Sequence, residues 1–323
     1  MFARMKTVRP SGRAAAVIFA ATLLSVGSGY SQENGDLSSL RERALELVNE
    51  TRQEQGLEAL DLTPPLNEAA IAHARDMLDR DYYSHVSPEG ETVRDRFMEH
   101  DGSRWKLVAE NIARCSGCMA PADLERVEQF QEGWMNSPGH RENILTEGLD
   151  GFGFGIAGEG DQIYAVQTFS GAGSSRGTGP DEEAVEIPDG EQVSIAVAAI
   201  NRARKRAEVD EVSSSAALDA VAGELLVRDG GGERLVRETN DLFGLLPEDS
   251  SGDWRSLRIV AAGCGGCGTL ETAADVRSFV QQWLDNPQYE QTLLAQTTDA
   301  LGFAMYAGGD GRKVAIAVAG SHR

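Results

Sequence analysis

The feature that most constrains this 323-residue chain is an internal repeat. Shifting the sequence by 149 positions aligns identical residues of its two halves without a gap, and a slightly different shift extends the match toward the start of each copy. A repeat of this length is a whole domain rather than a small solenoid unit, so we predict two tandem copies of one fold. The matched pairs are Cys115 with Cys264, Cys118 with Cys267, Val127 with Val276, Phe130 with Phe279, Trp134 with Trp283, Asp150 with Asp299, Gly153 with Gly302, Phe154 with Phe303, Asp161 with Asp310, Gly171 with Gly320, Asn49 with Asn201, Arg52 with Arg204 and Leu66 with Leu218.

Hydrophobic periodicity predicts the elements of the first copy. Apolar residues recur at helical spacing over residues 37–55, 66–77 and 122–134, with Leu124 expected to face inward, and Thr92 and Asp95 have the spacing of a capping box. Strands are predicted over 105–112, 151–156 and 162–169, and the last two form a hairpin. Helices and antiparallel strands in this order predict a layered α+β fold.

The chain divides into four parts. Residues 1–31 have the basic start, short apolar run and small residues of a signal peptide, which would leave Gln32 as the first mature residue; an uncleaved anchor is the alternative. The first copy is residues 32–171. Residues 172–190 are rich in Gly, Ser and acids, which is typical of a flexible linker, and residues 191–323 are the second copy. We therefore expect an exported protein, extracellular or periplasmic, without stable membrane insertion after cleavage.

The net charge restricts the partners. It is −21 for the whole chain, and removing the four basic residues of the signal peptide would make it −25. A surface this acidic repels phosphate backbones and anionic lipids, so we expect no nucleic-acid partner and no polybasic attachment to membranes. The simplest interpretation of the charge is solubility, although such a surface also attracts divalent cations weakly.

Three polar residues of the first copy stand out as candidate site residues. His140 follows Ser137 and Pro138, which are suited to the N-cap and the first position of a helix, so its ring should lie on a rigid first turn. His85 lies in a turn-forming segment, and Glu110 interrupts an apolar run. His73, in contrast, falls on the apolar face of its helix, where a hydrogen-bonded core histidine is the usual case, and is left out of the site.

The second copy has lost all three candidates. His140 becomes Tyr289, Glu110 becomes Ile259, and residues 229–258 contain no histidine to replace His85. The core positions match while the polar candidates do not, which indicates a functional site in the first copy only. The second copy is then a degenerate module for support or for protein interactions.

The residues around these candidates resemble the CAP superfamily of cysteine-rich secretory, venom antigen and pathogenesis-related proteins. The resemblance covers residues 37–171 and rests on His85 with Pro88 and Gly90, on Glu110-Asn111, and on the segment 134–145 around His140. It implies an α-β-α sandwich with a central antiparallel sheet and a cleft formed by two histidines and acidic residues. Three of the four cleft positions match.

The fourth cleft position departs from the family pattern. Many family members carry a second glutamate just after the residue corresponding to Trp134, whereas Met135, Asn136 and Ser137 follow here, as is common in bacterial members. A mechanism that needs two carboxylates is therefore disfavoured. Ser137 or Asn136 could donate a hydrogen bond into the cleft instead.

Three functions fit this sequence. The resemblance implies a binding module for a peptide, glycan or lipid, which we favour. The alternative is a zinc hydrolase in which His85 and His140 hold the metal and Glu110 is a ligand or the general base, since zinc takes N and O ligands and activates water. The third is a structural interaction protein of the envelope or extracellular matrix, with the three residues as a buried polar network. No cofactor is required, and zinc is the one we consider.

The cysteines occur as two pairs at equivalent places in the copies. In an exported protein an even number of cysteines favours disulfides, and the glycines within Cys115–Cys118 and Cys264–Cys267 allow a tight local ring. Bridges between the copies and a single four-cysteine zinc site are the alternatives. A thioredoxin-like redox role is least favoured, because the order of strands and helices around the motif differs from that fold.

Overall fold

The computed structural model describes residues 28–323, except residue 180 and residues 229–234. Of the predicted signal peptide, residues 1–27 lie outside the described part of the chain. Its last residues, 28–31, belong to the first helix. In the part of the chain that the structure describes, no helix combines the length and the apolar character needed to cross a membrane.

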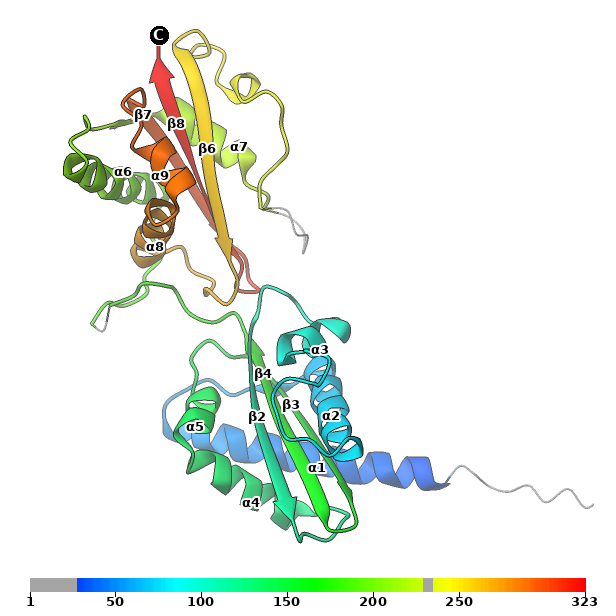
Figure 1. The fold of residues 1–323 in the computed structure, drawn as a ribbon. Coiled ribbons are helices and arrows are strands. Elements are labelled where there is room, and N and C mark those ends of the chain that lie inside the picture. Colours follow the sequence, from blue (N-terminus) through cyan, green and yellow to red (C-terminus); the bar gives the residue numbers. More distant parts are fainter. Residues whose placement is uncertain (1–27, 180, 229–234) are drawn as a thin grey trace, which may run out of the picture. The chain divides into compact units, whose positions relative to one another are not determined.

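The first copy consists of helices packed around the strands of one sheet (Figure 1). In chain order they are α1 (Ser28–Glu54), β1 (Asp61–Leu62), α2 (Pro64–Asp79), α3 (Val93–Glu99), β2 (Leu107–Ser116), α4 (Leu124–Met135), α5 (Pro138–Ile144), β3 (Gly151–Glu159) and β4 (Gln162–Gly171). The predicted capping box is present, because Thr92 and Asp95 bond reciprocally at the start of α3. The prediction that Leu124 faces inward is wrong: this residue is 48% exposed, because it is the first residue of α4.

The sheet of the first copy has the strand order β1-β3-β4-β2. Strands β3 and β4 form the predicted hairpin, and β2 pairs antiparallel with β4, so that Glu110 lies opposite Thr168. Strands β2, β3 and β4 form the predicted antiparallel sheet, and the two-residue strand β1 adds a short parallel pairing with β3. Strand β2 lies at the edge of the sheet, so one of its two sides pairs with no other strand of this sheet.

Helices cover both faces of this sheet, which makes an α-β-α sandwich. Along β4, Ile163 and Ala165 point into a core shared with α1 and α4, whereas Tyr164 and Val166 point toward α2. This alternation is the two-residue period of a strand that is buried on both faces. Gly153 allows α2 to lie against β3, because a Cβ atom there would be 2.2 Å from the α2 backbone.

The second copy repeats this architecture (Figure 1). Its elements are α6 (Asp189–Arg206), β5 (Ser213–Ser214), α7 (Ala216–Leu225), the 3-10 helix η1 (Phe243–Leu245), β6 (Trp254–Cys264), α8 (Ala273–Leu284), α9 (Pro287–Leu293), β7 (Ala300–Ala307) and β8 (Lys313–His322). Its strand order, β5-β7-β8-β6, corresponds to that of the first copy, with β5 parallel to β7. Helices α4 and α8, and likewise α5 and α9, begin and end 149 residues apart.

The matched arginines Arg52 and Arg204 explain one of the sequence identities. Arg52 is 1% exposed and donates to the carbonyls of Ile144 and Thr146 at the end of α5, at 2.8 and 3.0 Å. Arg204 does the same at the end of α9, where it bonds the Leu293 carbonyl at 2.7 Å. The last carbonyls of a helix have no partner within it, so each arginine satisfies acceptors that would otherwise be buried unpaired.

The segment 172–190, predicted to be a flexible linker, makes contacts with the second copy. The Ile187 amide donates to the Glu271 carbonyl at 2.9 Å, and Glu182 pairs with Arg277 of α8 at 2.5 Å. In the described residues this segment therefore follows the surface of the second copy.

The four cysteines form two local disulfides. Cys115 is bonded to Cys118, with Cα atoms 5.7 Å apart, and Cys264 to Cys267, with Cα atoms 6.1 Å apart. The described residues contain no free cysteine. Each disulfide closes the loop that follows the edge strand of its sheet.

Candidate functional site

Glu110 is the buried centre of the candidate site. It lies in the middle of β2, and its side chain is only 2% exposed. Oε1 accepts a hydrogen bond from His85 Nδ1 at 2.9 Å, and Oε2 accepts one from Arg96 at 2.8 Å. Both carboxylate oxygens are therefore engaged, one by an imidazole and the other by a buried guanidinium.

Arg96 positions the His85 segment as well as Glu110. Its guanidinium donates to the main-chain carbonyls of His85 and Glu91, both at 3.1 Å. Ser87 closes the turn between them, because its amide donates to the Glu91 carbonyl at 3.0 Å and its hydroxyl accepts from the Glu91 amide. The backbone of His85 is therefore fixed, although its side chain is 52% exposed.

The contact with Glu110 determines which face His85 presents. A carboxylate accepts from Nδ1–H, so the neutral ring carries its lone pair on Nε2, on the side away from Glu110. The carboxylate–imidazole pair is the arrangement that orients histidines in catalytic and metal sites. His85 can thus offer Nε2 to a hydrogen-bond donor or a cation.

Helix α5 brings His140 to the same edge of the sheet. Asn111 donates from Nδ2 to the His140 carbonyl at 3.1 Å, and Asn143 donates to Asn111 Oδ1 at 2.9 Å and to the Glu110 carbonyl at 3.1 Å. Pro138 is the first helical residue, and Ser137 occupies the N-cap position in an extended conformation. Both residues occupy the predicted positions, although the Ser137 side chain makes no capping hydrogen bond.

The two imidazoles interact electrostatically. Burial lowers the pKa of His140, and the nearby charge of His85 lowers it further. His140 is therefore neutral at pH 7. Adjacent residues of a strand point to opposite faces of the sheet. His85 therefore contacts the edge strand β2 on the face of Glu110, whereas α5 is bonded to β2 on the face of Asn111.

His73 lies behind this site and is part of the core. Its side chain is 1% exposed; Nε2 bonds the Ser84 carbonyl at 3.0 Å and is 3.8 Å from Glu110 Oε1. Burial is the main cause of the lowered pKa of His73. Tyr82 lies beside its Nδ1 at 3.4 Å and donates to Asp76, and burial together with this bond raises the pKa of Tyr82.

Arg96 and Asn111 are the site residues that sequence reasoning missed. Arg96 follows the recognised capping box by one residue and precedes Phe97, so it falls on the buried face of α3. A charge at a buried position needs a partner, which is the signal that could have revealed it. Asn111 directly follows Glu110, but a buried amide has no comparable pattern in a sequence.

The donor set of the site is small for a resident metal. No group of three or more His, Cys, Asp or Glu side chains suited to hold an ion occurs among residues 37–323 that are described. Glu110 is committed to Arg96 and His85, which leaves two imidazoles as donors. Catalytic zinc sites have three protein ligands, so two imidazoles do not make up such a site without ligands from elsewhere.

The second copy has an apolar surface at the equivalent place. Ile259, which replaces Glu110, is 37% exposed, and Val260, which replaces Asn111, is 2% exposed. Tyr289, which replaces His140, packs against the core of its own copy. Within the described residues, the complete set of site residues therefore occurs in the first copy.

Comparison with known proteins identifies relatives of the first copy. The model of the CAP family, described as the cysteine-rich secretory protein family, matches residues 45–169. The protein named "Uncharacterized protein YkwD" of Bacillus subtilis (strain 168) is 36% identical over 131 residues, which are 41% of this chain and 47% of that protein. The chain thus spans less than half the length of this curated relative.

Solved structures include similar proteins as well. An extracellular protein containing a SCP domain from Bacillus anthracis str. Ames shares 32% sequence identity, with 41% of this chain and 40% of that chain covered and a TM-score of 0.34. The structure of Na-ASP-1 shares 11% identity, with 88% and 90% covered and a TM-score of 0.37.

Proposed function

Residues 45–169 of this chain are a CAP domain of the bacterial type, and from that premise we propose that the protein is an exported ligand-binding module whose contact groups are His85 and His140. Export is part of the proposal and is based on the basic and apolar pattern of residues 1–31. The observation that supports binding best is the double engagement of Glu110, which orients His85 and is itself held by Arg96.

This engagement favours binding over hydrolysis. A general base must reach the water whose proton it removes, within about 3 Å. Glu110 is 2% exposed, and both of its oxygens already accept hydrogen bonds from protein donors. We infer that Glu110 acts as a positioning residue for His85.

The protonation states favour an uncharged polar ligand. His140 is neutral at pH 7 because burial and His85 lower its pKa, so its ring attracts anions only weakly. The chain as a whole carries a net charge of −21, which disfavours acidic ligands further. Peptide amides and sugar hydroxyls, which both donate and accept hydrogen bonds, match the ring nitrogens of the two histidines.

A divalent cation is the second component that we propose to test. His85 and His140 would hold it through ring nitrogens, and the remaining ligands would come from water or from the bound molecule. Zinc bound in this way would supply a Lewis acid. With two protein donors, binding would be weaker than in a site with three or four.

The experiment is a histidine-ring NMR titration of the full chain with three probes: Zn²⁺, a chitooligosaccharide and trialanine. We expect at least one probe to shift the His85 and His140 signals together and to lose affinity in His85→Ala/His140→Ala. His322→Ala is the matched control, because this histidine of the second copy is half exposed and also pairs with a carboxylate, Asp299.

Two results would overturn the proposal. Probe binding that survives the double substitution would place the binding site elsewhere. Hydrolysis of peptides or esters that depends on Zn²⁺ and is abolished in Glu110→Gln would replace the binding module by the hydrolase alternative.

A further inference from the structure

The second copy contains a pocket beside its disulfide. The pocket has a volume of about 430 Å³, which is within the range of small-ligand sites. Cys264 is partly exposed, whereas Cys267 is fully buried. The residues that line it include Arg176, Cys264, Gly265, Asp275 and Gln282.

Arg176 brings a positive charge to the buried sulfur. Its Nε lies 3.0 Å from Cys267 Sγ, and its Nη2 donates to the Gly265 carbonyl at 3.3 Å. The main chain of Arg176 is fixed as well, because its amide donates to Asp275 Oδ1 at 3.0 Å. An arginine of the segment between the copies is therefore held against one particular sulfur of the disulfide.

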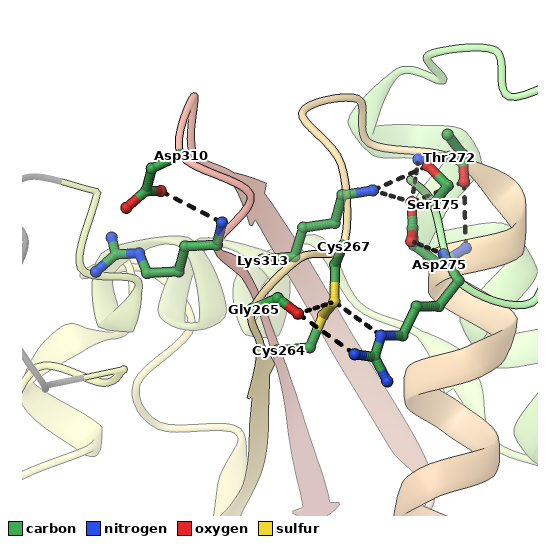
Figure 2. The surroundings of a disulfide bond; sticks show 10 residues. Ser175, Cys264, Gly265, Cys267, Thr272, Asp275, Asp310 and Lys313 are labelled. Atoms are coloured by element: carbon green, nitrogen blue, oxygen red, sulfur yellow. Dashed lines mark hydrogen bonds and ion pairs between the residues drawn. A yellow bond between two sulfur atoms is a disulfide. The ribbon is translucent and has the colours of Figure 1, made fainter. Parts of the chain in front are cut away.

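The neighbouring acid is neutralised. Asp275 would repel a negatively charged sulfur, but Lys313 pairs with it (Figure 2). The two charged atoms are 2.5 Å apart, and the Asp275 and Lys313 side chains are 1% and 0% exposed. Lys313 also donates to Ser175 Oγ at 3.0 Å, which holds the residue before Arg176 in place. Arg176 is therefore the charged group in direct contact with Cys267 Sγ, while Asp275 is paired with Lys313.

These contacts suit thiol–disulfide exchange. A disulfide is cleaved by a thiolate that attacks one sulfur while the other leaves as a thiolate, and a leaving thiol of lower pKa leaves faster. A guanidinium in contact with a sulfur stabilises its thiolate form. The accessible Cys264 and the arginine-bound Cys267 thus have the properties of the attacked and the leaving sulfur.

We propose that Cys264–Cys267 is an exchange site for a small peptide thiol bound in this pocket. The thiolate of the peptide attacks Cys264 Sγ and forms a mixed disulfide with it. The bond between Cys264 and Cys267 breaks, and its electron pair goes to Cys267 Sγ, which becomes a thiolate paired with Arg176. No further oxidant or reductant is needed, and the reverse attack by Cys267 releases the peptide thiol.

The first copy provides an internal reference. Its disulfide also has an arginine nearby, but Arg126 Nη1 lies 3.7 Å from Cys115, which corresponds to the attacked sulfur rather than to the leaving one. Arg126 also bonds Gln129 of the same helix. The arginine of the first copy is therefore not placed to stabilise the leaving sulfur, and its disulfide should exchange more slowly.

The test uses the oxidised full chain with reduced glutathione as the peptide thiol, followed by alkylation and peptide mass spectrometry. We expect a glutathione adduct on Cys264, formed faster than any adduct on the first-copy disulfide. Arg176→Gln should slow its formation by about tenfold, since an opposite charge in contact lowers a pKa by about 1–3 units. The matched control Arg126→Gln should leave the rate of adduct formation on Cys264 unchanged.

A second variant tests the pocket itself. Gln282 is exposed at the pocket, so Gln282→Trp should obstruct it without disturbing the core. This variant should slow the reaction with glutathione but not with mercaptoethanol, which is much smaller. An adduct on Cys267, equal rates at the two disulfides, an unchanged rate in Arg176→Gln, or equal effects of Gln282→Trp on both thiols would each overturn the proposal.

Discussion

Replacing Arg96 by methionine tests whether the candidate site is built on a buried ion pair. Arg96 and Glu110 are 6% and 2% exposed and are joined by a hydrogen bond of 2.8 Å. Methionine fills a similar volume but removes the charge and three donated hydrogen bonds, including those to the carbonyls of His85 and Glu91. Glu110 would keep a buried charge without its main partner.

The expected cost is large. Removing one partner of a buried ion pair destabilises a protein by about 3–5 kcal/mol, because the remaining charge is left without compensation. This is a substantial fraction of the roughly 5–15 kcal/mol that stabilises a typical domain. With a melting-temperature change of about 3–4 °C per kcal/mol for a domain of this size, the first copy should melt about 10–20 °C lower.

Differential scanning calorimetry of the full chain measures this effect, with the transition of the second copy as an internal reference. Arg96→Met/Glu110→Gln should recover part of the loss, because no unpaired charge remains. Arg80→Met is the matched control: Arg80 pairs with Glu89 on the surface, where an ion pair contributes little. A shift below about 3 °C in Arg96→Met, or a double variant no more stable than the single one, would refute the reasoning.

Two further predictions concern pH and packing. Burial lowers the pKa of His73 and His140 below the ordinary value of 6.5, so the unfolded state binds more protons than the folded state below that pH. In urea titrations, the free energy of unfolding of the first copy should therefore fall as the pH is lowered from 7.5 to 5.5. A pH dependence of this free energy that is unchanged in His73→Gln and in His140→Gln would contradict the prediction. Gly153→Ala and Gly302→Ala should each destabilise their own copy by about 1–3 kcal/mol or more, because the new Cβ atom would lie 2.2 Å from a helix backbone. Gly139 faces open space, so Gly139→Ala should not change the stability. Equal melting temperatures for all three variants would show that the helices can move away.

Much of the fold was predictable because its signals are local. The apolar residues of the helix predicted over 66–77 recur at helical spacing, and Leu66, Ala69, Ala70, Ala74 and Met77 are all buried. The capping box at Thr92 and the β3–β4 hairpin also depend on neighbouring residues alone. The burial of Leu124 was predicted wrongly, because periodicity continues to the first residue of a helix, where the chain has not yet reached the core.

The sequence by itself determined the repeat, the two-residue and 3.6-residue patterns of its elements, and the loss of His85, Glu110 and His140 from the second copy. Only the tertiary structure decided which groups meet. Arg96 is 14 residues from Glu110, and Arg176 is 91 residues from Cys267. The partner of a buried charge or sulfur depends on how separate elements pack, and no local pattern of residue types encodes that packing.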